Sequence, residues 1–166
     1  MKRGLQGLFL ALVLAALAQG VWQHDRLPAR VMSHFDAAGR PNGWMTRDAF
    51  LAWQAGTLLF LAALFEGIVL LQSRLPKELV NLPHRDYWLA PERRAATDAW
   101  VSGLVLTIGC LLMAFFMALF HQIYRANLAG GPQPLTGVGP LTALMGLASA
   151  AVILVTLRRF VRKPAA

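Results

Sequence analysis

Residues 100–124 read WVSGLVLTIGCLLMAFFMALFHQIY, and this stretch decides the fold because it is long, apolar and free of charged residues. A helix that spans a bilayer needs about 20 mostly apolar residues. Three further stretches of this kind occur at residues 5–22, 50–71 and 138–157. The chain of 166 residues is therefore predicted to be an all-α, integral membrane four-helix bundle that forms one domain over residues 1–166.

The composition supports a membrane protein. Apolar residues make up 57% of the chain and charged residues only 14%, whereas about a quarter of the residues of a soluble domain are charged. The net charge of +8 would suggest nucleic acid as the partner of a soluble protein. Here the cations occupy the gaps between apolar stretches, where they control topology. The expected partner is the lipid bilayer, and no nucleic-acid partner is expected.

The distribution of Lys and Arg predicts an orientation. Cations lie before the first stretch, in residues 72–99 and in residues 158–163, while the other two connections hold fewer. Cationic loops stay in the cytoplasm, so both termini are predicted to be cytoplasmic. The same region also fits a cleaved secretory signal. Lys2-Arg3 would be its charged start, and Ala16-Leu17-Ala18 its small-residue cleavage site after the apolar run. Retention is favoured because the apolar run continues to Trp22.

Small residues recur at three-to-four spacing in each stretch, which is typical of helices that pack closely in lipid. A compact bundle with small-residue interfaces is therefore expected. The residues are Ala11, Ala15 and Ala18; Ala52, Gly56, Ala63 and Gly67; Gly103, Thr107, Cys110, Ala114 and Ala118; and Gly139, Ala143, Gly146 and Ala150.

Glu66 is the acid that lies well inside an apolar stretch. Intramembrane carboxylates are costly and usually face the bundle or water. Glu66 is either a proton, cation or ligand site, or a residue that fixes helix packing. Thr107 and Ser149 lie at a comparable depth and are the expected hydrogen-bond donors to it.

The sequence contains no recognisable catalytic or metal-binding constellation. His24, His34, His84 and His121 form no HxxxH, HExxH or Cys/His cluster, and Cys110 is the single cysteine. No nucleophile turn or phosphate-binding Gly loop is present. We therefore predict a protein that is not an enzyme, with no catalytic residues, no metal and no cofactor. His121 fits an interfacial anchor.

The first connection, LPARVMSHFDAAGRPNGW at residues 27–44, is polar, aromatic and rich in turn residues. Gly39 and Asn42-Gly43 accept a positive φ, and Pro41 fixes its own φ, which predicts a defined turn. Thr46 or Asp48 is expected to cap the next helix. In the second connection, Pro91 followed by Glu92 is typical of a helix start.

Together the two connections resemble a family of bacterial integral-membrane domains of unknown function with an LP…HF…G.P..W loop. The same domain occurs in SdpI-type immunity proteins, which protect against a secreted toxic peptide. The resemblance covers residues 5–100, and the chain is too short for the second domain of those proteins. The matching residues are Leu27, Pro28, His34, Phe35, Gly39, Pro41 and Trp44, followed by Asn81-Leu82-Pro83, Tyr87-Trp88-Leu89 and Pro91-Glu92-Arg93.

The resemblance implies a multi-pass protein of the bacterial inner (cytoplasmic) membrane. The leading hypothesis is a non-enzymatic immunity or sensing module that recognises a peptide or lipid-like ligand through its extracytoplasmic loop. A structural or assembly subunit and a small oligomeric transporter are the alternatives, and a membrane-protein partner or a homo-oligomer stays open. The expected ligand-binding residues are His34, Phe35, Gly39, Pro41, Trp44 and Glu66.

Overall fold

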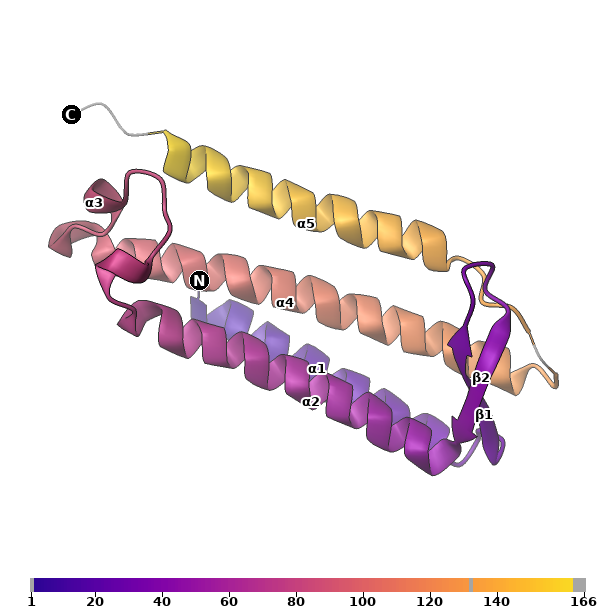
Figure 1. The fold of residues 1–166 in the computed structure, drawn as a ribbon. Coiled ribbons are helices and arrows are strands. Elements are labelled where there is room, and N and C mark those ends of the chain that lie inside the picture. The colour runs from indigo at the N-terminus through magenta and orange to yellow at the C-terminus, as the bar shows by residue number, and fades with distance from the viewer. Residues whose placement is uncertain (1, 132, 163–166) are drawn as a thin grey trace.

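The computed structural model describes residues 2–131 and 133–162, so Lys163 of the cationic tail lies outside the described residues. Within them, four helices are long and apolar enough to cross a membrane, as predicted: α1, α2, α4 and α5 (Figure 1). The elements in chain order are α1 (Lys2–His24), β1 (Arg30–Phe35), β2 (Pro41–Thr46), α2 (Arg47–Leu71), η1 (Gln72–Arg74), η2 (Lys77–Leu79), α3 (Arg85–Trp88), α4 (Pro91–Leu128) and α5 (Val138–Val161).

Most ends of the long helices extend beyond the predicted apolar stretches. Thr46 caps α2, because the backbone N–H of Ala49 donates to its Oγ1 at 3.2 Å. Pro91 occupies the first turn of α4, where its missing N–H costs no hydrogen bond. Both helix starts confirm the sequence prediction.

The helices form a core of three with a fourth at its side. Side chains of α1, α2 and α4 make the buried centre, including Phe9, Phe50, Leu58, Leu106 and Phe120. Helix α5 packs chiefly on α4, and the most apolar part of α5 has no buried residue (Figure 1). Helix α5 therefore belongs to the set of four helices but lies beside the core of three instead of within it.

The predicted small-residue interfaces are largely wrong. In α4, Gly103 and Cys110 are buried, but the stripes of the other three helices face mainly outward. The helices instead meet through aromatic and aliphatic residues, which fill the space between them. The exposed residues of the four stripes are Ala11, Ala15, Ala18, Ala52, Gly56, Ala63, Ala114, Gly139, Ala143, Gly146 and Ala150.

A buried amide joins the three core helices. Gln54 of α2 donates from Nε2 to the carbonyl of Ala16 in α1 at 3.2 Å, and its Oε1 accepts from the hydroxyl of Tyr124 in α4. Gln54 and Tyr124 are 1% exposed. Gly20 lies against the amide, because a Cβ there would be 2.8 Å from Gln54 Oε1. The network satisfies polar groups that would be costly alone in an apolar interior.

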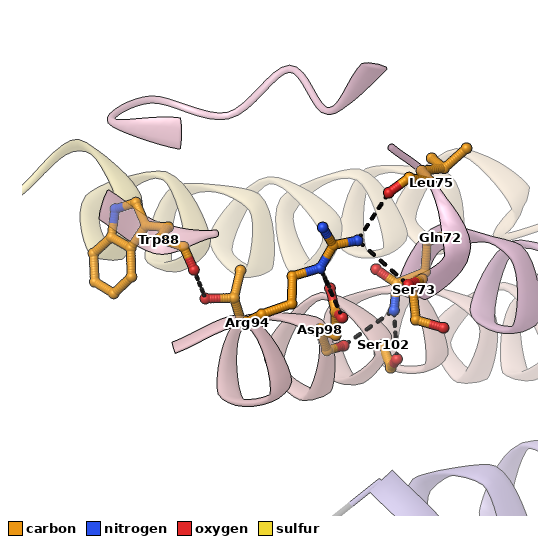
Figure 2. Close-up of polar contacts among 8 residues, drawn as sticks. Gln72, Ser73, Leu75, Trp88, Arg94, Asp98 and Ser102 are labelled. Atoms are coloured by element: carbon orange, nitrogen blue, oxygen red, sulfur yellow. Dashed lines mark hydrogen bonds and ion pairs between the residues drawn. The ribbon is translucent and has the colours of Figure 1, made fainter. Parts of the chain in front are cut away.

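At the end of the molecule that carries the start of α1 and the end of α5, the second connection is fixed by polar contacts. Figure 2 shows the guanidinium of Arg94, which pairs with Asp98 at 3.0 Å and donates to the carbonyl of Leu75 at 3.0 Å. Trp88 Nε1 and His84 Nε2 donate to the carbonyls of Phe160 and Val161, each at 3.1 Å. These carbonyls belong to the last turn of α5, where carbonyl groups have no N–H donor within their own helix.

At the opposite end, the first connection is a β-hairpin rather than a loop, so the fold is not purely helical. Strands β1 and β2 pair antiparallel, with Met32 opposite Trp44 and His34 opposite Gly43. The register shifts on both sides of His34, which is typical of a β-bulge. Of the glycines expected at positive φ, Gly39 has one and Gly43 does not. Gly43 is needed for space, since a Cβ there would lie 2.9 Å from the Cβ of His34.

The substitution Gly20→Val should destabilise the helix core, because the added side chain displaces the hydrogen-bonded amide of Gln54. We expect a loss of about 1–3 kcal/mol in the free energy of unfolding, measured by thermal unfolding in mild detergent. The matched control is Gly56→Val, since no atom lies within 4 Å of a Cβ at Gly56. Equal unfolding temperatures for the two variants would contradict the role of the network.

Candidate functional site

A cavity of about 860 Å³ opens between the hairpin and the ends of α4 and α5. The turn of the hairpin forms one wall, Trp53 of α2 another, and the apolar start of α5 a third. This volume lies within the range of roughly 300–1,000 Å³ that small-molecule sites occupy. The lining is Ser33, His34, Phe35, Asp36, Ala37, Ala38, Gly39, Trp53, Leu119, Ile123, Leu135, Gly137, Val138, Gly139, Thr142 and Ala143.

Asn127 of α4 holds the hairpin wall in place. The backbone N–H of Met32 donates to Asn127 Oδ1 at 2.7 Å, and Asn127 Nδ2 donates to the carbonyl of Met32 at 3.1 Å. The amide thus forms the two backbone hydrogen bonds that a neighbouring strand would form with the outer edge of β1. Asn127 is 8% and Met32 5% exposed, so these bonds are shielded from water. They fix the position of His34 and Phe35, which follow in the same strand.

The turn of the hairpin is joined to the connection before α5. The backbone N–H of Leu135 donates to the carbonyl of Gly39 at 2.9 Å. Gly39 has a φ of +76°, and a Cβ there would lie 2.4 Å from the carbonyl oxygen of Leu135. A side chain at this position is therefore excluded both by the backbone conformation and by the close approach.

Asp36 organises the turn. Its Oδ1 accepts from the backbone N–H groups of Arg40 at 2.8 Å and Ala38 at 2.9 Å, and its Oδ2 pairs with the Arg40 guanidinium at 2.8 Å. These donors, above all the Arg40 backbone N–H, hold the pKa of the Asp36 carboxyl below its ordinary value. The carboxylate is thus occupied within the hairpin and shapes the cavity rim.

His34 presents a polar edge to the cavity. Its Nδ1 lies 3.0 Å from Ser33 Oγ, and its ring centre lies 6.5 Å from that of Trp53. The side chain is exposed, and its Nε2 makes no hydrogen bond to any residue that the structure describes. An imidazole beside an indole and the apolar side chains of α4 offers one hydrogen-bonding group on a largely apolar surface.

The remaining predicted ligand residues lie at the cavity, in strand β2 outside the cavity, and in the interior of α2. Phe35 and Gly39 line the cavity with His34, whereas Pro41 and Trp44 of β2 do not. Trp44 is 45% exposed, and its ring lies 5.7 Å from the guanidinium carbon of Arg30. The structure therefore brings three of the predicted residues together at one cavity.

Glu66 lies far from this cavity, 13 residues after Trp53 in α2, or about 20 Å at the rise of a helix. Its Oε2 accepts from Gln6 Nε2 of α1 at 2.8 Å, and its Oε1 is buried with no partner among the described residues. The expected donors are wrong: Thr107 donates to the carbonyl of Gly103, and Ser149 lies 3.9 Å from Met145 Sδ. Gln6 of α1 is the donor in their place.

Asn127 and Trp53 of the site were not predicted from the sequence, and neither was Gln54 of the helix core. Asn127 and Gln54 are uncharged amides in otherwise apolar helices, and an unpaired amide is costly there, so each needed an explanation. That signal was available in the sequence. Trp53 carried no signal, because an aromatic residue near a helix end is ordinary in membrane proteins.

The histidines do not converge in the structure. His84 is at the opposite end from His34, and His121 is exposed in a shallow groove between α1 and α4. No group of three metal-ligating side chains lies together in residues 2–131 and 133–162.

Comparison with known proteins finds one family. Residues 11–60 match the profile of a domain of unknown function, DUF1648. The match spans most of α1, the hairpin and the first half of α2. Searches of the curated proteins and of the solved structures found no match.

Acid should loosen the hairpin turn through Asp36. Because the folded pKa is depressed, its contribution to stability is present above the ordinary carboxyl pKa of about 3.9. That contribution is lost as the pH falls through the lower folded pKa. We expect the amide of Arg40 to exchange faster below about pH 4, after correction for intrinsic exchange rates. Asp36→Asn should remove this pH dependence; if the dependence persists in that variant, another group is responsible.

Proposed function

We propose that this chain is a non-enzymatic ligand-binding protein of the bacterial cytoplasmic membrane, with the hairpin cavity on the extracytoplasmic side. The observation that carries the proposal is the cavity itself, which is lined by His34, Phe35 and Gly39 and braced by Asn127 and Leu135. A rigid rim, an aromatic wall and a few polar groups are typical of recognition sites.

The distribution of cations supports this orientation. The end opposite the hairpin carries Lys2, Arg3 and the cations of the second connection and of the end of α5. The positive-inside rule puts that end in the cytoplasm, together with both termini. Retention of α1 is supported by Phe9, Val13 and Ala16, which are buried in the core of three helices.

The ligand that fits best is a secreted peptide with an apolar or aromatic side chain. Trp53 and Phe35 provide an apolar contact surface, and the exposed His34 edge offers a hydrogen bond to a peptide group. Protection against a toxic peptide, as in SdpI-type immunity proteins, is the physiological role that this chemistry favours. Direct binding at the cell surface is the first step of such a role.

The test is a deletion strain that carries wild-type or variant protein and is challenged with a panel of synthetic apolar toxic peptides. For a peptide against which the wild type protects, Trp53→Ala should raise the dissociation constant about thirtyfold. This is the effect expected when a central aromatic contact is removed. His34→Ala should also reduce protection. This second variant guards against misfolding, because Trp53 packs on Phe50 and Phe120 while His34 is exposed.

Trp44→Ala is the matched control, since Trp44 is at the same end but outside the cavity. Protection by Trp44→Ala should equal that of the wild type. If no peptide discriminates the wild type from the deletion strain, or if all three variants protect equally at equal membrane levels, the proposal is wrong.

A structural or assembly subunit is the second candidate, favoured by the outward face of α5. Gly146 and Ala150 are exposed along one side of this helix, beyond the cavity that Gly139 and Ala143 line. Small residues let helices approach closely in lipid. Purification in mild detergent should then recover a partner in fixed ratio, whereas a monodisperse single protein contradicts this role.

A further inference from the structure

An apolar groove of about 360 Å³ lies where α1, α4 and α5 meet, at the end opposite the hairpin. Its walls include Leu5 of α1, Gly103 and Leu104 of α4, and Val152 and Val155 of α5. The hydroxyls of Thr107 and Thr156 also line it, but each donates to a carbonyl of its own helix, at 2.8 and 3.0 Å. The groove therefore presents an apolar surface to any molecule that occupies it.

One polar group in the wall has no protein partner. The indole N–H of Trp100 is buried and forms no hydrogen bond with any described residue. A buried donor without an acceptor costs about 1–3 kcal/mol. Because this nitrogen is enclosed, Trp100 contributes the apolar surface of its ring to the groove.

A cation stands beside the same tryptophan. The guanidinium carbon of Arg159 lies 4.3 Å from the centre of the Trp100 ring and 5.7 Å from that of Trp88. Arg159 is exposed and forms no ion pair within residues 2–131 and 133–162. Lys2 and Arg3 precede Leu5 within one helical turn, so the surroundings are cationic as well.

We propose that this groove is a binding site for an anionic phospholipid of the cytoplasmic leaflet. One acyl chain occupies the apolar groove, and the lipid phosphate pairs with Arg159 beside the Trp100 ring. The cytoplasmic leaflet carries anionic lipids, and the opposite charge of Arg159 selects them over zwitterionic ones. The site rests on the proposed membrane orientation but not on the role of the hairpin cavity.

The experiment is native mass spectrometry of the protein in mild detergent, with phosphatidylglycerol or phosphatidylcholine of identical acyl chains. The wild type should retain phosphatidylglycerol preferentially. Arg159→Gln should reduce that retention about fivefold, which corresponds to the loss of one cation near an anionic headgroup. Arg158→Gln, at the neighbouring exposed position, should leave the retention unchanged.

A second pair of variants tests the groove itself. Gly103→Leu should fill it and lower retention of the phospholipid, while Gly146→Leu is the control on the open face of α5. Equal retention of the two lipids by the wild type, or equal losses in the two arginine variants, would overturn the proposal. So would thermal stabilisation by inorganic phosphate equal to that by phosphatidylglycerol, because the site would then be a simple anion site. Incorporation of the wild type into liposomes tests the membrane placement separately.

Discussion

The pairing of the Asn127 amide with the backbone of Met32 is the constraint on which the candidate site depends. A two-stranded hairpin is marginal alone, and its outer edge presents unpaired N–H and C=O groups. Asn127 satisfies both groups of Met32 from within α4 and is itself braced by the carbonyl of Ile123 at 2.9 Å. The helix thereby sets the position of β1 and of the cavity wall.

The molecule separates two kinds of chemistry at its two ends. The hairpin end has a preformed cavity with an aromatic wall, and the opposite end has cations, a short helix and side-chain caps on α5. Glu66 belongs to neither site: its contact with Gln6 joins α1 to α2. That contact supports a packing role.

The sequence predicted the four apolar helices and the Thr46 and Pro91 helix starts because these follow from local residue patterns. It did not predict the hairpin, since β1 pairs with a strand that begins at Pro41 and contains Gly43. The hairpin is also stabilised by Asn127, almost a hundred residues away. The small-residue stripes were misleading because their spacing shows which residues share a face of a helix. It does not show which other helix packs against that face. His34, Phe35 and Gly39 lie in one loop of the sequence and line one cavity, whereas Trp53 joins them only through the tertiary fold.

Amide hydrogen exchange at Met32 tests the central claim most directly. In the wild type this amide should exchange as slowly as the paired amides of the hairpin. In Asn127→Leu it should lose its protection, and the hairpin should open while α4 keeps its own protection, because the leucine preserves the apolar helix. Rapid exchange of Met32 in the wild type, or unchanged protection in the variant, would contradict the account that α4 holds the cavity wall.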